Sequence, residues 1–282
     1  MLVITTVSGV RARRAELART GRRLAFVPTM GALHEGHLAL VRHARELADE
    51  VWASVFVNPA QFAPGEDFDR YPRDLERDRA LLEQAGAAML FAPSTKEIYP
   101  RPSATIVDVP ALSGGLCGAH RPGHFRGVAL VVAKLLNIVQ PHVAVFGAKD
   151  WQQATVIRRM VDDLCLPVHI DIHPTEREGD GLARSSRNAY LSPEERRAAT
   201  VLHRALEKAA AAVQAGERSG SALEAETASE VARESLARLQ YVAAVDPDTL
   251  APLATIPARV LIALAVHVGA TRLIDNIYVE VP

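Results

Sequence analysis

The chain of 282 residues has few cysteines, few aromatic residues and no long apolar run. Its two cysteines, Cys117 and Cys165, are too few for a disulfide framework, which favours reduced thiols in a cytoplasmic protein. Aromatic residues make up only 5% of the chain, so single-stranded nucleic acid would find few rings to stack on. No stretch approaches the roughly 18 apolar residues of a membrane span. The apolar start, Met1–Val7, is too short for a signal peptide.

Charge of one sign is also lacking, because the formal net charge is −1 at pH 7. No global field therefore attracts nucleic acid or a membrane, and we expect neither as a partner. Arginine supplies most of the positive charge, since the chain has only four lysines. Any anion must then be bound by a local group of side chains, as in proteins that act on small molecules.

Short apolar runs alternate with helical patterns through the first 175 residues. Strands that are apolar throughout and separated by helices indicate a parallel sheet covered on both faces. The sequence thus predicts an α/β fold with a Rossmann-like sheet. The predicted strands are Leu2–Thr6, Leu24–Val27, Trp52–Val57, Met89–Ala92, Val143–Phe146 and Val168–Ile172, and helices are predicted at Leu75–Ala85, Val128–Val139 and Gln153–Leu164.

The pattern changes after Pro174. Ser192-Pro-Glu-Glu195 predicts a helix start, with Ser192 as N-cap, proline at the first helical position and Glu195 closing a capping box. Alanine-rich helices are expected from there to about Gln240, with a break at Gly216–Gly220. Short strands are expected at Tyr241–Val245, Val260–Val266 and Ile277–Val281. We therefore predict two domains, 1–175 and a smaller α+β domain, 176–282.

The segment Pro28–His37, Pro-Thr-Met-Gly-Ala-Leu-His-Glu-Gly-His, joins the predicted strand Leu24–Val27 to an amphipathic run, Leu38–Ala48. Such a junction directs backbone N–H groups and the positive end of a helix at an anion. His34 and His37 lie three residues apart at the helix start and therefore share one face.

Glycines in this segment remove Cβ atoms where a phosphate must approach, at Gly31 and Gly36. The alternative, a metal site, is weaker because His-Glu-Gly-His lacks the spacing of zinc peptidases. We interpret the segment, called the histidine turn below, as a phosphate site for a nucleotide.

Polar turns follow two further strands. Asn58-Pro-Ala-Gln61 and Gly147-Ala-Lys-Asp150 each come directly after an apolar run. Because the carboxyl ends of parallel strands share one edge, we expect these turns to converge with the histidine turn. Lys149 is a candidate phosphate contact and Asp150 a candidate Mg²⁺ ligand, although an ordinary surface pair remains an alternative.

Other candidates are Asn58, Gln61 and Gln153, which suit recognition of hydroxyl and carboxylate groups without adding charge, although ordinary cap and surface amides remain an alternative. The loop Glu178–Asn188 is rich in glycine, serine and arginine, and Arg187 is its candidate for stabilising a leaving pyrophosphate. The loop His120-Arg-Pro-Gly-His124 faces either the same edge or solvent. Asp67, Asp69, Asp74 and Asp78 form an acidic stretch that is either a solvated face or, at Asp78, a metal ligand.

Several long motifs occur in order and at suitable spacings. They are the histidine turn, Phe56-Val-Asn-Pro-Ala-Gln-Phe62, Arg70-Tyr-Pro-Arg73, Phe146-Gly-Ala-Lys-Asp-Trp-Gln-Gln153 and Gly181-Leu-Ala-Arg-Ser-Ser-Arg-Asn188. Together they resemble the pantoate–β-alanine ligase family, within the nucleotidyltransferases that carry a histidine signature. The resemblance covers essentially the whole chain.

This resemblance implies a Rossmann-like catalytic domain, a C-terminal lid domain and a homodimer. It also implies that ATP with Mg²⁺ converts pantoate to an enzyme-bound pantoyl adenylate, which then reacts with β-alanine. By resemblance, His37 is the catalytic proton donor, with His34, Lys149 and Arg187 beside it. Gln61, Gln153 and Asn58 would bind pantoate, with Gln61 also near β-alanine. The implied ATP-binding residues are Met30, Gly31, Ala32, Leu33, His34, Glu35, Gly36, His37, Gly147, Ala148, Lys149, Asp150, Glu176, Arg184, Ser185, Ser186 and Arg187.

The chain departs from the family pattern at four positions. Ala148 stands where glutamate is usual, Arg184 where methionine or leucine is usual, and Trp151 where tyrosine is usual. Glu176 replaces a small apolar residue whose backbone is expected near adenine. Two other functions stay open: a nucleotidyltransferase with a different acceptor, and a nucleotide-binding regulator without turnover. Lys149 and Arg187 favour an enzyme.

Overall fold

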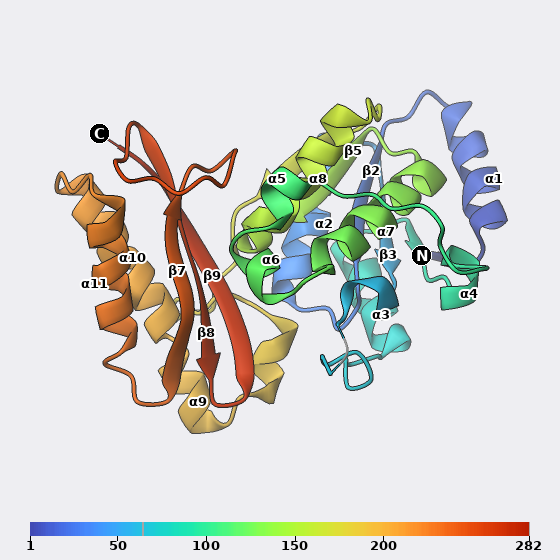
Figure 1. Cartoon of the computed structure of the whole chain (residues 1–282). Coiled ribbons are helices and arrows are strands. Elements are labelled where there is room, and N and C mark those ends of the chain that lie inside the picture. Colours follow the sequence, from blue (N-terminus) through green and yellow to red (C-terminus); the bar gives the residue numbers. More distant parts are fainter. Residues whose placement is uncertain (64, 282) are drawn as a thin grey trace. The chain divides into compact units, whose positions relative to one another are not determined.

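The computed structural model describes residues 1–63 and 65–281. The chain forms two compact units, both drawn in Figure 1. The first comprises Met1–Ser113, Arg121–Ala148 and Gln153–Pro174. The second comprises Gly114–His120, Lys149–Gln152 and the chain from Thr175 onward. The sequence predicts a single boundary near residue 175, whereas the second unit also contains two short segments from earlier in the chain.

A six-stranded parallel sheet forms the centre of the first unit, in the order β1-β4-β3-β2-β5-β6. All six strands lie where the apolar runs predict them, which confirms the α/β fold. Their bounds are β1 Leu2–Ile4, β2 Leu24–Thr29, β3 Glu50–Val55, β4 Met89–Phe91, β5 Val143–Gly147 and β6 His169–His173. β2 continues past its predicted end at Val27. Pro28, which has no N–H to donate, lies beyond the last β2 residue paired with β5.

Helices cover the sheet. On one face α2 and α3 pack over Ala25, Val27 and Ala53. The alternate residues Phe26 and Trp52 point to the opposite face, where α7 contacts β2 and α1. The helices of this unit are α1 Val7–Ala18, α2 Glu35–Leu47, α3 Leu75–Ala85, α4 Thr95–Ile98, α5 Pro110–Ser113, α7 His124–Val139 and α8 Trp151–Asp163, whose first two residues belong to the second unit.

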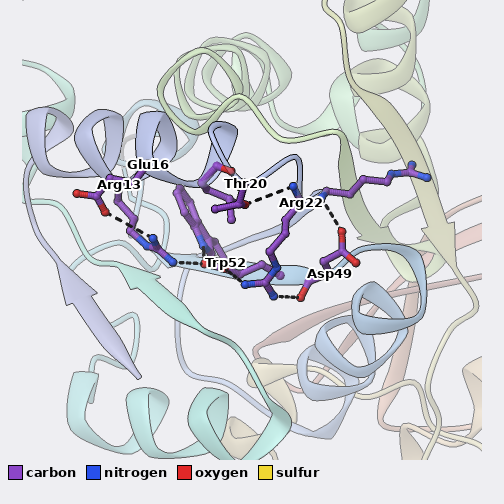
Figure 2. Close-up of polar contacts among 9 residues, drawn as sticks. Arg13, Glu16, Thr20, Arg22, Asp49 and Trp52 are labelled. Carbon is purple, nitrogen blue, oxygen red and sulfur yellow. Dashed lines mark hydrogen bonds and ion pairs between the residues drawn. The ribbon is translucent and has the colours of Figure 1, made fainter.

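A buried carboxylate holds the amino end of β3, at the edge of the sheet away from the histidine turn. Glu50 accepts hydrogen bonds from Arg13 Nη2 at 2.9 Å, Arg22 Nη1 at 3.1 Å and Trp52 Nε1 at 2.8 Å. Figure 2 shows Arg13, Arg22 and Trp52 converging on this point. Burial of a charge is tolerated here because three donors surround it. None of these residues is among the sequence-predicted site residues.

The second unit is built on a three-stranded antiparallel sheet, β7-β8-β9. Its elements are α6 Cys117–His120, α9 Pro193–Ala198, α10 Val201–Gln214, α11 Gly220–Val231, β7 Ala237–Val245, β8 Arg259–Val268 and β9 Thr271–Glu280. Ser192 and Glu195 form the predicted capping box of α9. The expectation of helix to about Gln240 is wrong, because α11 ends at Val231 and β7 begins at Ala237. The β-branched and aromatic residues of 239–245 favour pairing with β8 over continuing the helix.

The two faces of the small sheet carry different partners. α10 and α11 cover one face over Ile262 and Leu264. On the other face Trp151 packs near Leu261, stacks on Tyr278 with ring centroids 5.6 Å apart, and donates Nε1–H to the carbonyl of Pro247 at 2.8 Å. Segment 149–152 therefore belongs physically to this unit. Within the part of the chain that the structure describes, no helix combines the length and apolar character needed to cross a membrane.

Candidate active site

Three neighbouring strands bring the predicted turns to one edge of the large sheet. β2 lies between β3 and β5, so the strand order changes direction beside β2. Open α/β sheets bind ligands at this kind of position, outside the carboxyl ends of the strands. The histidine turn follows β2, Asn58–Gln61 follows β3, and Gly147 ends β5. The histidine turn, Asn58–Gln61 and Gly147 therefore lie at one edge of the sheet, as predicted, whereas Lys149 and Asp150 belong to the second unit.

The histidine turn begins with a fixed backbone. The hydroxyl of Thr29 donates to the carbonyl of Ser54 at 2.7 Å and accepts the N–H of Gly31 at 3.1 Å. Gly31 has φ +83°, and a Cβ there would lie 2.8 Å from Asp78 Oδ2. Ala32 also has a positive φ, 51°, which is costly for a residue with a side chain. Other contacts must therefore hold this turn in place.

Asp78, on α3, supplies those contacts. Its Oδ2 accepts the N–H of Ala32 at 2.9 Å and its Oδ1 accepts the N–H of Leu33 at 2.8 Å. Burial raises the pKa of Asp78 above the ordinary 3.8, although the two N–H donors act in the opposite direction. The carboxylate is 1% exposed, so the alternative of a solvated acidic face is wrong at this position.

The two histidines cap the start of α2 and each other. His34 is the N-cap, and its Nδ1 accepts the N–H of Gly36 at 3.2 Å. His37 Nδ1 accepts the N–H of His34 at 3.4 Å, and the ring centroids are 4.1 Å apart. Because each Nδ1 acts as an acceptor, the neutral rings carry their proton on Nε2. The N–H groups of His34 and Gly36 therefore donate to imidazole nitrogens. The sequence analysis expected backbone N–H groups of this turn to bind a phosphate.

The amide side chains after β3 lie inside the first unit. Asn58 is 1% exposed and Gln61 is 8% exposed. Asn58 Nδ2 donates to Gln61 Oε1 at 3.1 Å and to the carbonyl of Gly127 at 3.1 Å. Gln153, the third residue of α8, is half-buried.

The loop His120–His124 divides between the two units. In the first unit His124 Nδ1 donates to the carbonyl of Gln61 at 2.8 Å, while Arg121 Nε and Nη2 bind the two carboxylate oxygens of Glu66, both at 2.7 Å. In the second unit the His120 ring stacks on Tyr241, with centroids 5.6 Å apart. Arg121 and His124 thus support the Gln61 turn. The sequence alone left open whether this loop faces the sheet edge or solvent.

The Glu66–Arg121 pair gives the fold a pH dependence. Burial raises the pKa of Glu66, but hydrogen bonds and charge from Arg121 outweigh it and leave the pKa below the ordinary 4.5. The pair therefore stabilises the fold above pH 4.5, and this contribution is lost as the pH falls through the lower folded pKa. We expect Glu66→Gln to lower the free energy of unfolding by about 1 kcal/mol at pH 7. Urea titrations across the acid range should show the difference shrinking. Glu76→Gln, at an exposed position on α3, is the matched control, and a difference independent of pH would contradict this prediction.

A glycine on α7 allows the Gln61 turn to approach closely. A Cβ on Gly127 would lie 2.1 Å from the carbonyl oxygen of Ala60 and 2.6 Å from the N atom of Gln61. We expect Gly127→Ala to lower the free energy of unfolding by about 1–3 kcal/mol, because backbone must move to make room. Gly115→Ala, where a Cβ meets nothing within 4 Å, should leave thermal unfolding unchanged. Equal melting temperatures for the two variants would show that the turn is not held by this contact.

Lys149 and Asp150 lie in the second unit. Lys149 Nζ is 3.8 Å from Asp150 Oδ2, and the carbonyl of Lys149 accepts Asn276 Nδ2–H at 2.8 Å. Ala148, the last residue of the segment Arg121–Ala148 of the first unit, is buried. Of the four departures from the family pattern, Ala148 lies in the first unit, and Trp151, Glu176 and Arg184 lie in the second.

The serine- and arginine-rich loop is a hydrogen-bonded hairpin. The N–H of Arg184 donates to the carbonyl of Glu176 at 2.9 Å, and Ser185 caps a short 3₁₀ turn by accepting the N–H of Arg187 at 3.3 Å. Arg177, which the sequence did not single out, binds the buried Asp275 with its two terminal nitrogens at 2.6 and 3.1 Å. Ser186 begins the 3₁₀ turn, and Arg184–Arg187 are all half-buried.

Metal binding by protein groups alone is not favoured. Across residues 1–63 and 65–281, no cluster of three or more histidine, cysteine, aspartate or glutamate side chains is arranged to hold an ion. Both oxygens of Asp78 already accept backbone N–H groups, so it fits a magnesium ion poorly. Asp150, with about half of its side chain exposed, fits one better.

Comparison with known proteins decides the family. The sequence profile described as pantoate-beta-alanine ligase matches residues 2–278. The chain belongs to the pantoate–β-alanine ligase family. The pantothenate synthetase of Heliobacterium modesticaldum is 55% identical to it over 281 residues, 100% of both chains.

Solved structures agree with this assignment. Pantothenate synthetase from Thermus thermophilus superposes with a TM-score of 0.93 at 49% identity, over 98% of this chain and 99% of that one. The pantoate–β-alanine ligase of Francisella tularensis, complexed with β,γ-ATP and β-alanine, superposes with a TM-score of 0.81 at 33% identity, over 98% and 97% of the two chains. The fold of this chain is thus that of the pantoate–β-alanine ligases, and the family is one of ATP-dependent ligases.

Proposed function

We propose that the chain condenses pantoate with β-alanine, using ATP and releasing AMP and diphosphate. The observation that carries the proposal is the histidine turn at the carboxyl end of β2, flanked by the turns after β3 and β5, in a chain that matches this family along its length. The ATP- and β-alanine-bound Francisella relative supports the same substrates here.

The first step forms a pantoyl adenylate. A pantoate carboxylate oxygen attacks the α-phosphorus of ATP, the bond to the bridging oxygen breaks, and diphosphate leaves. Negative charge grows on the phosphate oxygens, which the Nε2–H groups of His34 and His37 are suited to stabilise. Lys149 and Arg187 supply positive charge. The protein acts mainly by positioning and electrostatics.

The second step forms the amide. The β-alanine amine attacks the acyl carbonyl carbon, loses a proton, and expels AMP. We assign pantoate to Gln61 and Gln153, with Gln61 also near β-alanine. ATP is assigned to the histidine turn, to Gly147–Asp150, to Glu176 and to Arg184–Arg187. Neutral amides suit the hydroxyl and carboxylate groups of pantoate because they donate hydrogen bonds without a competing charge.

Magnesium enters the proposal with ATP. Mg²⁺ commonly binds through phosphate oxygens and one or two carboxylates, while keeping several waters. Asp150 is the carboxylate that fits this role, and Asp78 is assigned to the histidine turn. When bound, the ion would neutralise phosphate charge.

The family resemblance also supports a homodimer and a lid function for the smaller domain, 176–282. Two thiols without a disulfide, Cys117 and Cys165, support a cytoplasmic setting. Light scattering of the purified chain tests the dimer.

Release of pyrophosphate, measured with ATP and a panel of acids, tests the function. We expect release that depends on pantoate, and pantothenate only when β-alanine is added. Release with a different acceptor would favour another nucleotidyltransferase. ATP binding without release under any condition would favour a regulator.

A further inference from the structure

The amide of Asn58 is oriented by two backbone groups of opposite polarity. Its Oδ1 accepts the N–H of Ala60 at 3.3 Å, while its Nδ2 donates to the carbonyl of Gly127 at 3.1 Å. Exchanging the two ends of the amide would place donor against donor and acceptor against acceptor. The hydrogen-bond network therefore fixes which atom is nitrogen.

This orientation determines the orientation of Gln61. The second hydrogen of Asn58 Nδ2 points to the Gln61 side chain, at 3.1 Å, so the Gln61 atom that faces it must be the acceptor Oε1. Gln61 Nε2 is then directed away from Asn58, and it has no hydrogen-bond partner among the described residues. Gln61 thus presents a donor of two hydrogens rather than an acceptor.

Tyr99 completes the hydrogen bonding of Asn58. Its hydroxyl donates to Asn58 Oδ1 at 2.9 Å, so both donor and both acceptor positions of the Asn58 amide are used. Burial raises the pKa of Tyr99 to about 12, so the hydroxyl remains a donor even in alkaline solution near pH 10. Lys134 Nζ lies 4.4 Å from the centre of the Tyr99 ring and donates to the neighbouring carbonyl of Ile98 at 2.6 Å. The ring is therefore held in place.

The backbone of Gln61 is fixed separately. His124 Nδ1 donates to its carbonyl at 2.8 Å, and Arg121 Nη1 lies 3.1 Å from His124 Nε2, which makes that nitrogen the acceptor. The turn and the side chain of Gln61 are thus held by two independent sets of contacts.

We propose that Asn58 is a positioning residue that, backed by Tyr99, locks Gln61 as a hydrogen-bond donor toward the acceptor oxygens of the acid substrate. This differs from the sequence-based expectation that Asn58 itself binds pantoate, since an amide that is 1% exposed and fully hydrogen-bonded has no capacity left for a ligand. The inference rests on the proposed function, in which Gln61 binds pantoate.

A double-mutant cycle between Asn58→Ala and Gln61→Ala tests the proposal in the full-length protein. Releasing the Gln61 amide should raise the KM for pantoate by about 10- to 100-fold, the cost of one or two misplaced hydrogen bonds. The KM for ATP should change less than twofold. In the double variant the pantoate KM should be no higher than in Gln61→Ala alone, because Asn58 acts through Gln61. Asn137→Ala, which removes an exposed amide from α7, is the matched control and should leave both constants unchanged.

The outcomes separate the inference from the function on which it rests. Additive effects would overturn the inference, because they would mean that Asn58 meets pantoate directly. So would equal rises in the two KM values, which would indicate general disruption of the fold. If Gln61→Ala leaves the pantoate KM unchanged, it is the assignment of pantoate to Gln61 that fails.

Should Asn58→Ala not fold, Tyr99→Phe gives the same test with a smaller change. It keeps the ring against Lys134 and removes only the hydroxyl that donates to Asn58. We expect a rise of about 3- to 10-fold in the pantoate KM, absent when Gln61 is alanine. An unchanged pantoate KM in Tyr99→Phe, with Gln61 intact, would overturn the role of Tyr99.

Discussion

Replacing His37 with alanine (His37→Ala) is expected to lower kcat for pantoate-dependent diphosphate release on the order of 10²–10³-fold, the usual effect of losing one donor to a developing anion. Nδ1 of His37 accepts the N–H of His34, so the ring proton is on Nε2. This Nε2–H is the donor that the variant loses. Steady-state assays of diphosphate release measure the effect.

The same substitution also removes a cap from α2, so a control must separate the two losses. His37→Asn keeps a side-chain acceptor within reach of the His34 N–H but has no imidazole. It should melt close to wild type and still lose most of the rate. Wild-type turnover in both variants would remove His37 from the mechanism.

Replacing Asp78 is expected to affect both stability and rate. In Asp78→Asn the new NH₂ faces one of the two backbone N–H groups that the carboxylate accepts, so a buried donor loses its partner. We expect a loss of about 1–3 kcal/mol in the free energy of unfolding. Because the turn carries His34 and His37, kcat should fall on the order of 10²-fold when the turn shifts. Denaturant titration and diphosphate release measure the two effects.

The pH dependence gives this prediction a second readout. The folded pKa of Asp78 lies above its ordinary 3.8, so the native state binds this proton more tightly than the unfolded state. The free energy of unfolding therefore falls as the pH rises from 3.8 to the higher folded pKa of Asp78. Asp78→Asn should lack this contribution to the pH dependence. Asp74→Asn, at the N-cap of the same helix, is the control, and should change neither the free energy of unfolding appreciably nor kcat, because asparagine caps a helix about as well as aspartate. Unchanged kcat in Asp78→Asn would mean that the turn does not depend on this carboxylate.

The strands and the turns after them could be predicted because each has a characteristic residue pattern within a few consecutive residues. Uniformly apolar runs such as Val143–Phe146 are typical of strands buried on both faces. The Ser192 capping box is likewise a local pattern. Local patterns were sufficient to place the histidine turn at the same sheet edge as Asn58–Gln61 and Gly147.

Contacts between distant residues could not be predicted in this way. Asp78 lies 45 residues from Leu33, and His124 lies 63 residues from Gln61, so neither contact leaves a periodic signal. The acidic stretch around Asp78 has the composition of a solvated face, and only the folded chain shows that one carboxylate is buried. The sequence therefore proposes groups to bind the substrates, whereas the groups that hold those candidates in place are seen only in the fold.

The interleaved course of this chain limits how it can exchange parts with a relative. Lys149–Gln152 and Gly114–His120 belong to the second unit, where Asn276 Nδ2 binds the carbonyl of Lys149 and Trp151 stacks on Tyr278. A chimera that joins this chain to a relative after residue 174 would pack Trp151 of one parent against β9 of the other. A recombinant must therefore take Gly114–His120 and Lys149–Gln152 from the same parent as the C-terminal part. Otherwise the new protein inherits a mismatched surface within its smaller unit.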